Sequence, residues 1–498
     1  MRIWAVLVFL STLLSAAPAD LKVSVYATAG GIERLLATPE GRARAADAMR
    51  KLGVTRVVLE GRRGDEYIAP DKLRALRGQL AELGFATTGG LATVPGEHFG
   101  VRQEGPLSWL NWEADATQKG IEGFFRNNAA VFDELVLDDF FCTSDVSAQA
   151  QAARGDQEWG KYRRDLLTRL SQSIVIEAAR KVKPGIRLVI KYPQWYDMFH
   201  AYGYDPARSS AIFDAVWVGT EVRNPETVRM GFVQPTEGYM NYRWLTAVSR
   251  GKTEAAWFDH IECTAQNFID QAWQSVLAGA PELILFNIID VVEGHPGHAL
   301  FRKALPALQD TARRVKGKAL KGVAFYKPPN SEPGDNRYLM DYLGMLGIPV
   351  VPVAEYPRES ETVILGVQAA ADPDLAEKVS AHMKRGARIA MTASLMDRVK
   401  APAGVIRLDL HTFSDQDFRD ANEWLLAPRQ LSLMKMSRDE ADALRKSLGV
   451  ALSAPVGIAY YRIGREEAFY SFLNADTDVV LRGRTLRVPA HALLWANP

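Results

Sequence analysis

The stretch Glu134-Leu-Val-Leu-Asp-Asp-Phe-Phe-Cys-Thr-Ser-Asp145 gives the clearest indication of the fold. Its apolar run, residues 135–137, ends in two adjacent carboxylates, Asp138 and Asp139, and a polar, turn-rich segment follows. Such a run is typical of a strand buried in a parallel sheet. In a (β/α)8 barrel the C-terminal strand ends carry the chemistry, so acids placed there are candidate catalytic residues.

Strand and helix patterns alternate on both sides of this stretch. A first strand at 23–27 precedes a helix with Thr38 as its cap and Pro39 at its first position, which ends at Gly53. Seven further strand–helix pairs follow, a repeat of the size expected for a (β/α)8 TIM barrel. An open doubly wound sheet is the alternative, but no glycine-rich phosphate turn follows the first strand. The other strands are expected at 55–59, near 85, 135–137, 187–191, 215–219, 255–259 and 282–287.

A second α/β pattern begins after Lys316, and the chain ends in short strands and turns. The tail after residue 456 is most simply a small β-sandwich, preceded by a helix at 438–448. The α/β segment is expected to contain strands at 322–326, 349–353, 362–365 and 387–391 and helices at 337–346 and 374–385. The predicted domains are a catalytic barrel at 20–316, an α/β domain at 317–412, and linker helices with a C-terminal β domain at 413–498.

Residues 1–19 have the features of a signal peptide. Arg2 precedes an apolar run, and Ala17-Pro18-Ala19 fits a small-residue cleavage site before Asp20. The run is short for a membrane span. We therefore expect export to a periplasm or the exterior, with an uncleaved anchor as the alternative.

Composition narrows the possible functions. Among 498 residues, 60 basic and 59 acidic side chains leave a net charge of +1, which argues against a nucleic-acid binder. The only cysteines, Cys142 and Cys263, are too few for a cysteine-rich zinc framework. Export would permit a disulfide between them. Free thiols are favoured because the fourth and seventh strands, which precede them, are not neighbours.

Several predicted strands end in carboxylates. Glycosidic hydrolysis requires two carboxyl groups, one to protonate the leaving oxygen and one to attack or to activate water. Because successive strand residues face opposite sides, only one of Asp138 and Asp139 can point fully into the mouth, and Asp139 is favoured as nearer the rim. Ordinary ion pairs, with Arg62, Arg63 or Arg223, are the competing explanation for any single acid. The strand-end acids are Glu60, Asp138, Asp139, Glu221, Asp259 and, just beyond the seventh strand, Glu262.

Side chains suited to sugar binding lie around these acids. A lysine can hydrogen-bond sugar hydroxyls and lower a neighbouring carboxylate's pKa, while aromatic rings stack on the sugar. Trp109 and Trp112 fit either such a cleft or ordinary barrel packing. The candidate substrate-binding residues are Glu60, Lys191, Tyr192, Trp195, Arg223, Asp259 and Asn287.

Four short segments of the sequence resemble barrel-type glycoside hydrolases. The resemblance implies a sugar-active barrel. Barrels similar to β-galactosidases use acids at strands four and seven, here Asp138 or Asp139 with Asp259 or Glu262. Those similar to α-galactosidases use acids at strands four and six. The β-galactosidase group usually has Asn-Glu at strand four, and the Asp-Asp here favours the second arrangement, with Asp139 as nucleophile or base and Glu221 as acid. The segments are Gly105-Pro-Leu-Ser-Trp109, Leu137-Asp-Asp-Phe-Phe-Cys142, Ile190-Lys-Tyr-Pro-Gln-Trp-Tyr196 and Gly219-Thr-Glu-Val-Arg223.

The α/β segment resembles the trimerisation domain of certain β-galactosidases, which is itself similar to class I glutamine amidotransferases. Amidotransferase chemistry needs a nucleophilic cysteine, and none follows Cys263. We therefore expect residues 317–412 to serve either as a structural domain or as the surface through which the chain forms a homo-oligomer. The best candidate for a metal is His295-Pro-Gly-His298 with Asp290 and Glu293, but a Pro-Gly turn holds ligands poorly, and we expect no metal or other cofactor.

The sequence thus predicts an exported (β/α)8-barrel glycosidase whose partner is a carbohydrate. A non-catalytic carbohydrate-binding barrel is the main alternative. A lyase acting on acidic polysaccharides is a third, although it should carry more basic residues at the rim than Lys191 and Arg223.

Overall fold

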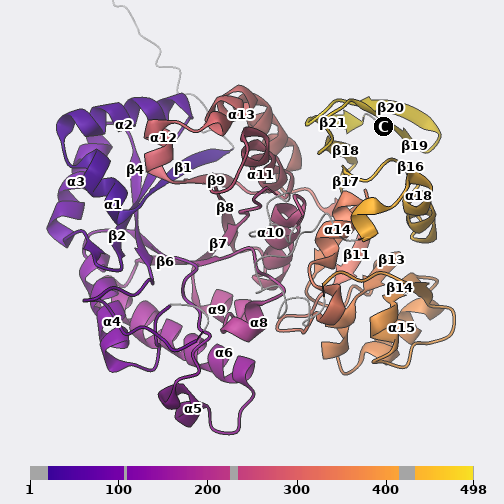
Figure 1. Ribbon diagram of the computed structural model, residues 1–498, viewed down its shortest axis with the longest axis horizontal. Helices are drawn as coiled ribbons and strands as arrows, with labels where there is room; N and C mark the ends of the chain where they lie inside the picture. The colour runs from indigo at the N-terminus through magenta and orange to yellow at the C-terminus, as the bar shows by residue number, and fades with distance from the viewer. Residues whose placement is uncertain (1–20, 106–108, 225–233, 414–431, 497–498) are drawn as a thin grey trace, which may run out of the picture.

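A computed structural model describes residues 21–105, 109–224, 234–413 and 432–496, so the predicted signal peptide lies outside the described residues. The largest sheet is closed, because β1 pairs with β2 on one side and β9 on the other. β3 (Glu66–Tyr67) is a short antiparallel addition to β2. The other eight strands are parallel and form the predicted (β/α)8 barrel, seen down its axis in Figure 1. They are β1 (Lys22–Ala27), β2 (Arg56–Arg63), β4 (Ala86–Ala92), β5 (Glu134–Leu137), β6 (Arg187–Tyr192), β7 (Ala215–Gly219), β8 (Thr253–Asp259) and β9 (Glu282–Phe286).

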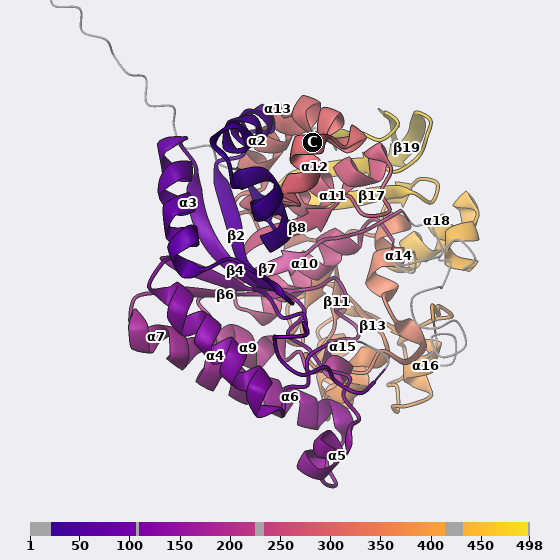
Figure 2. The same cartoon turned by 60° about the vertical axis from the view of Figure 1, so that its left-hand side comes forward.

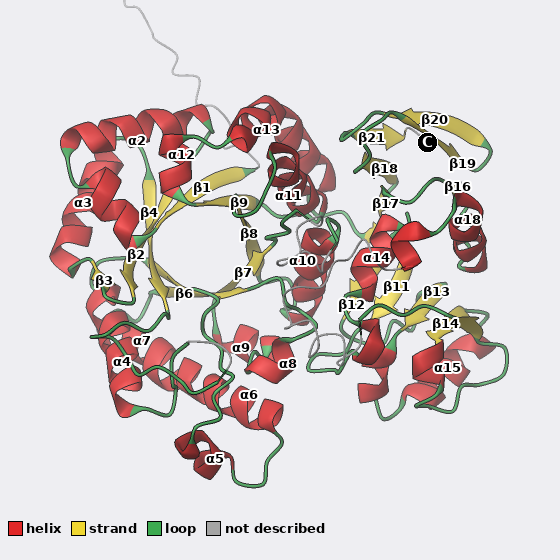
Figure 3. Ribbon diagram, in the orientation of Figure 1, coloured by secondary structure: helices red, strands yellow, loops and turns green. Residues whose placement is uncertain are grey.

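Helices cover the outside of the barrel (Figures 2 and 3). Thr38 caps the first long helix by accepting a hydrogen bond from Gly41 N, with Pro39 at its first position, as predicted. The long helical segment at 159–182 is interrupted by a π-helical stretch, Ser171–Glu177. The main helices are α2 (Pro39–Lys51), α3 (Pro70–Glu82), α4 (Asp115–Ala129), α6 (Trp159–Leu170), α7 (Ala178–Val182), α9 (Pro206–Ile212), α10 (Glu237–Val248), α11 (Ala265–Leu277) and α13 (Pro296–Val315). Shorter helices are α1 (Ala29–Gly31), α5 (Ala148–Arg154), α8 (Phe199–Tyr202) and α12 (Ile288–Glu293).

Side chains that point into the barrel form layers of alternating polarity. The floor is ionic: Arg56 pairs with Glu134 at 2.6 Å and with Glu282 at 2.8 Å. Above it lies an apolar layer that includes Val136 and Val189. Because every second strand residue faces inward, the same strands place Asp138 and Lys191 two positions later at the mouth. The third layer is therefore charged again.

The second and third domains contain the elements that the sequence predicts. The α/β domain has a parallel sheet in the order β12-β11-β13-β14-β15. The C-terminal domain has two antiparallel sheets, and β10, from the segment after the barrel, adds to one of them. The α/β elements are β11 (Val323–Tyr326), α14 (Leu339–Met345), β12 (Val350–Val353), β13 (Thr362–Leu365), α15 (Leu375–Lys384), β14 (Arg388–Thr392), α16 (Ala393–Met396) and β15 (Ile406–Leu408). The others are β10 (Leu320–Lys321), α18 (Arg438–Ser447), β16 (Leu452–Ser453), β17 (Ile458–Ile463), β18 (Glu466–Ser471), β19 (Thr477–Leu481), β20 (Arg484–Val488) and β21 (Leu493–Ala496).

The three parts share one continuous apolar cluster that runs from α10 and α11 through α14 to β17 and β18. Buried hydrogen bonds hold the C-terminal domain on α11: Tyr461 Oη donates to Gln274 at 2.5 Å, and Tyr470 Oη donates to Asp270 at 2.6 Å. Within the described ranges, every helix is too short or too polar to cross a bilayer.

Candidate active site

Lys191 lies at the centre of the barrel mouth and contacts three carboxylates. Its Nζ is 2.6 Å from Asp139 Oδ2, 2.7 Å from Glu221 Oε1 and 3.6 Å from Asp138 Oδ1. The same ammonium lies 4.4 Å from the ring centre of Trp257. An ammonium that is only 2% exposed needs such compensation. The structure therefore brings the acids that follow β5 and β7 to one point.

The two adjacent aspartates are not equivalent. Asp138, two positions after the inward Val136, is buried and accepts a hydrogen bond from Asp139 N at 2.8 Å. Asp139 has passed the end of the strand, and Tyr204 Oη donates to its carbonyl oxygen. The side chain of Asp139 is 12% exposed, against 3% for Asp138. Asp139 is therefore the more exposed of the two, whereas the alternation that points Val136 inward points Asp138 inward as well.

The charges around Lys191 shift the pKa values of these groups in different directions. Burial raises the pKa of Asp139 well above its usual range, and Lys191 only partly opposes this. Burial acts in the same sense on Asp138, but Lys191 and Arg63 outweigh it and hold the pKa of Asp138 below its usual value. Burial alone would lower the pKa of Lys191, yet Asp139, Glu221 and Asp138 raise it. The pKa values of the two adjacent aspartates thus shift in opposite directions, upward for Asp139 and downward for Asp138.

A second ion pair lies beside the first. Arg223 donates to Asp259 Oδ2 at 2.7 Å, and both side chains are largely buried. Burial raises the pKa of Asp259 to about 6 despite Arg223. The following residue, His260, pairs through Nδ1 with Asp290 Oδ2 at 2.6 Å. Both predicted residues, Arg223 and Asp259, therefore lie at the same rim as Lys191, but they satisfy each other.

Two residues predicted to bind substrate do not face an opening. Glu60 is fully buried and its oxygens accept hydrogen bonds from Tyr26 Oη at 2.7 Å, from Ala29 N at 2.9 Å and from Arg63 at 2.9 and 3.1 Å. Glu60 therefore anchors Arg63, which lies 3.5 Å from Asp138. The fully buried Tyr192 follows the inward Lys191 and packs outside the barrel.

The ring of Tyr192 lies 5.7 Å from Phe199 and 6.0 Å from Tyr204. The prediction that Tyr192 contacts substrate is therefore wrong, because the alternation that points Lys191 inward points Tyr192 toward the helices.

Aromatic side chains form one wall beside the acids. Trp195 is half-buried and stacks on Trp109, with ring centres 5.7 Å apart and planes 13° from parallel. Trp112 is instead buried, and its Nε1 donates to Cys142 O at 2.9 Å. The sequence left cleft or packing as alternatives for both tryptophans. Trp112 thus packs inside the protein, and Trp109 belongs to the wall. Asn287, just after β9, caps α12 by accepting from Ile289 N at 2.8 Å.

Two protein-family models match this chain. Residues 12–303 match the family model described as "Probable glycosyl hydrolase, catalytic domain". The chain belongs to this glycosyl hydrolase family. Membership confirms the glycosidase barrel predicted from the sequence. Residues 316–420 match a second family model, described as the second domain of the uncharacterized protein SSO3021.

Known proteins are similar to this glycosyl hydrolase over most of its length. The uncharacterized protein SSO3021 of Saccharolobus solfataricus is 21% identical over 408 residues, which cover 75% of this chain and 66% of that protein, just under two thirds of its length. α-L-Fucosidase isoenzyme 2 of Paenibacillus thiaminolyticus superposes with a TM-score of 0.63 at 10% identity, over 96% of this chain and 98% of that one. A catalytic mutant of Gan42B, a GH42 β-galactosidase from G. stearothermophilus, gives 0.62 at 9% identity, over 95% and 97%. Likeness at these identities establishes the fold and leaves the substrate open.

The cysteines of the glycosyl hydrolase are not bonded to each other, and its candidate metal-binding histidines form hydrogen bonds at the start of a helix. Cys142 and Cys263 are free thiols. His295 caps α13, because its Nδ1 accepts a hydrogen bond from Gly297 N at 3.1 Å. The backbone N–H of His295 donates to His298 Nδ1. Among the described residues no group of three or more His, Cys, Asp or Glu side chains is placed to hold a metal ion.

From the sequence, Arg63 was expected only as an ion-pair partner of a strand-end acid and Asp290 only as a candidate metal ligand, and His260 was not singled out. Arg63 is three residues beyond Glu60, and His260 directly follows Asp259. The signal available was position alone, since each lies at a strand end on the same rim as the acids.

Proposed function

We propose that the protein is an exported hydrolase of O-glycosidic bonds in which Asp139 and Glu221 are the paired carboxyl groups. The observation that carries this proposal is their shared contact with Lys191. Because their oxygens lie 2.6 and 2.7 Å from one Nζ, they are at most about 5.3 Å apart. Retaining glycosidases hold the two carboxyl groups about 5–5.5 Å apart, whereas inverting enzymes need ~6.5–9.5 Å to fit a water. The spacing supports retention.

The electrostatics favour one division of roles. A general acid must carry its proton before the glycosidic bond breaks, and burial favours the protonated form of Asp139 by raising its pKa. We therefore assign proton donation to Asp139 and attack to Glu221, the reverse of the roles expected from the sequence. Glu221 would bond to the anomeric carbon as Asp139 protonates the departing oxygen. Asp139, now ionised, would then remove a proton from the water that releases the sugar from Glu221.

Lys191 supports both steps without reacting. Its ammonium stabilises the ionised form of Glu221 and of Asp139 after proton transfer, because it touches both at hydrogen-bond distance. Trp195 and Trp109 offer a flat apolar face on which a sugar ring can lie. Asp259 is the alternative partner of Asp139, at strands four and seven. We favour Glu221 because Asp259 is already bound to Arg223.

Amide replacements test the proposal. Asp139→Asn and Glu221→Gln should each lower kcat by at least ~10²-fold on every aryl glycoside that the wild type cleaves, since each removes a group acting on the reacting atoms. Asp115→Asn is the control, because that carboxylate is 88% exposed on α4. Circular dichroism checks the fold. Full activity in both amide variants would overturn the assignment. A wild type that binds sugars and hydrolyses none of a panel covering both anomers would favour the non-catalytic carbohydrate-binding barrel.

The proposal includes export and self-association. The composition of residues 1–19 supports cleavage after Ala19, and N-terminal sequencing of the protein recovered from periplasm or medium tests it. A mature chain that starts at Met1 and stays with the membrane contradicts it. Oligomerisation through residues 317–412 rests on the resemblance of that domain to a trimerisation domain. Light scattering on the purified protein measures it, and a monomeric mass excludes it.

A further inference from the structure

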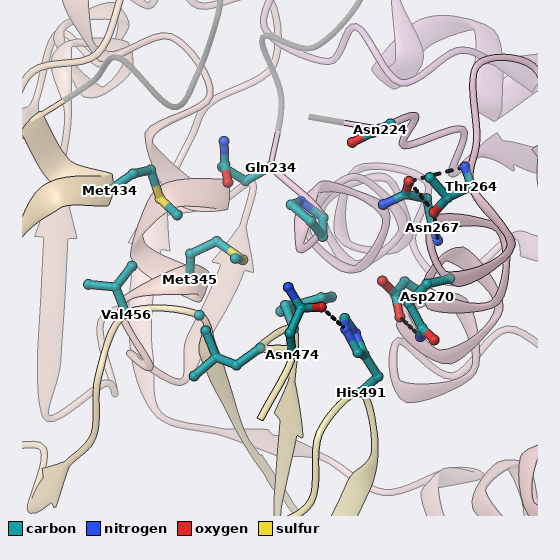
Figure 4. A pocket seen from close by; sticks show the side chains of 15 residues that line it. Asn224, Gln234, Thr264, Asn267, Asp270, Met345, Met434, Val456, Asn474 and His491 are labelled. Atoms are coloured by element: carbon teal, nitrogen blue, oxygen red, sulfur yellow. Dashed lines mark hydrogen bonds between the residues drawn. The ribbon is translucent and has the colours of Figure 1, made fainter. Parts of the chain in front are cut away.

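A cavity of about 530 Å³ lies between the barrel and the C-terminal β domain (Figure 4). Its volume falls within the ~300–1,000 Å³ typical of small-molecule sites. Its walls come from all three parts of the fold: Asn224 follows β7, Asn267 and Asp270 lie on α11, Met345 ends α14 and His491 precedes β21. No residue proposed for catalysis lines this cavity.

The cavity has two chemically different walls, as Figure 4 shows. Met345, Met434 and Val456 form an apolar side, and facing them are amide, hydroxyl and carboxylate groups. A sugar ring has the matching character, because its C–H groups form apolar faces and its hydroxyls point outward around the rim. Amide groups suit such a rim because they both donate and accept hydrogen bonds. The facing polar residues are Asn224, Thr264, Asn267 and Asp270.

Two polar atoms at the cavity, Asp270 Oδ2 and His491 Nδ1, have no hydrogen-bond partner among the described residues. Asp270 is 5% exposed, and its Oδ1 accepts from Tyr470 Oη at 2.6 Å and from Gln266 Nε2 at 2.8 Å. Its Oδ2 makes no hydrogen bond among the described residues. His491 has a left-handed backbone, φ +48°, and its Nε2 lies 2.8 Å from Asn474 Oδ1. His491 Nδ1 is buried and finds no hydrogen-bond partner in the described part of the chain. Buried polar atoms of this kind are normally satisfied, and a non-glycine residue at positive φ costs free energy, so both features favour a ligand site.

The cavity has one wall held by buried hydrogen bonds, and it lies close to the barrel mouth. The hydrogen bonds from Tyr461 to Gln274 and from Tyr470 to Asp270 hold its C-terminal wall on α11. Three of its lining residues, Pro235, Asn267 and Asp270, also lie beside Arg223, across a gap too small to admit a water molecule. Arg223 in turn pairs with Asp259 at the rim.

We propose that this cavity is a distal sugar subsite, which binds one or two units of an oligosaccharide whose glycosidic bond lies at Asp139 and Glu221. The inference rests on the proposed function for its connection to hydrolysis. The C-terminal β domain then acts in substrate selection, because it supplies His491 and Asn474 to a site that the barrel alone leaves open.

Two cavity variants and a matched control test the subsite. Met434→Trp fills the cavity from its apolar wall. His491→Gly removes the imidazole and suits the left-handed backbone. Lys435→Trp introduces the same side chain at the adjacent exposed residue, which does not line the cavity. Calorimetry and saturation-transfer NMR would measure the binding of cello-, xylo-, manno- and galacto-oligosaccharides of three to five units, in a Glu221→Gln background that blocks turnover.

We expect both cavity variants to bind the recognised oligosaccharide about tenfold more weakly or worse, a change of ~1.4 kcal/mol, and Lys435→Trp to bind like the parent. In the active background, kcat/KM on p-nitrophenyl monoglycosides should stay within about twofold of the wild type, because those substrates do not reach the cavity. The subsite is overturned if all variants bind the oligosaccharides with equal affinity, or if no oligosaccharide of the panel binds. The proposed function is judged separately, by whether the wild type hydrolyses monoglycosides. Loss of monoglycoside activity with unchanged oligosaccharide affinity also overturns the subsite.

Discussion

Asp197 and Lys327 form a buried ion pair across the boundary between the barrel and the α/β domain. Lys327 Nζ lies 2.8 Å from Asp197 Oδ1, and the side chains are 1% and 0% exposed. Asp197 also accepts a hydrogen bond from Tyr338 N at 2.6 Å. Because Asp197 follows Trp195 by two residues, the α/β domain fixes the loop that carries the aromatic wall. The α/β domain therefore contacts the loop beside the candidate active site.

Replacing Lys327 by Met should lower the free energy of unfolding by about 3–5 kcal/mol, because Asp197 is left buried without its counter-charge. Adding Asp197→Asn to Lys327→Met should recover part of that loss. Urea unfolding followed by tryptophan fluorescence measures both. The control is Lys72→Met, which breaks a pair with Glu33 whose side chains are about half exposed, with an expected cost of about 0–1 kcal/mol. Equal losses for Lys327→Met and Lys72→Met would show that the buried pair is not needed.

The pH dependence of hydrolysis should move when Asp138 is replaced by Asn. The negative charge of Asp138 raises the pKa of Asp139, so its removal lowers that pKa and Asp139 loses its proton at a lower pH. The alkaline limb of the kcat/KM profile, which reports the proton on Asp139, should shift to lower pH. The matched control is Asp133→Asn, an exposed carboxylate remote from the mouth. An unchanged alkaline limb would separate Asp139 from the acid role.

The strands of the barrel could be predicted because their signal is local. Runs such as residues 135–137 are apolar, short and bounded by polar turns, and burial on both faces requires that pattern. The break in the long helix at Ser171–Glu177 could not be predicted in the same way. A π-helical stretch is usually a single turn inserted within an α-helix, so the helical pattern of the residues on either side gives no sign of the break.

The candidate site was predictable in position and less so in detail. Strand ends on one rim identified Asp139, Lys191 and Glu221, because parallel strands deliver their last residues to the same mouth. Glu60 was misassigned because its partners come from elsewhere in the chain, as the bond from Tyr26 shows. Such pairing depends on register and on the loops that follow other strands. Tyr192 could have been excluded by strand alternation alone.

Stability should depend on pH through Asp270. Burial raises the pKa of Asp270 to about 6 in the folded protein, above the ~3.9 of an unfolded chain. The folded state therefore binds more protons between these values. The stability gained from protonated Asp270 is complete below about pH 4 and is lost as pH rises through about 6, by up to ~3 kcal/mol.

In Asp270→Asn the decline in unfolding free energy between pH 4 and 7 should be smaller than in the wild type. Urea unfolding at both pH values measures it, with the exposed Asp310→Asn as control. An identical decline in Asp270→Asn and the wild type would contradict the assignment.

The stereochemistry of hydrolysis should be retention, because the spacing at Lys191 leaves too little room for a water between Asp139, Glu221 and the sugar. Proton NMR during turnover should show the first product with the anomeric configuration of the substrate. Azide rescue separates the roles of the two acids. In Glu221→Ala, azide attacks from the vacated side and should yield a glycosyl azide of inverted configuration. In Asp139→Ala, azide displaces Glu221 from the glycosyl–enzyme and should yield the retained azide. The reverse pattern would return attack to Asp139 and proton donation to Glu221, and an inverted first product from the wild type would refute the retaining mechanism itself.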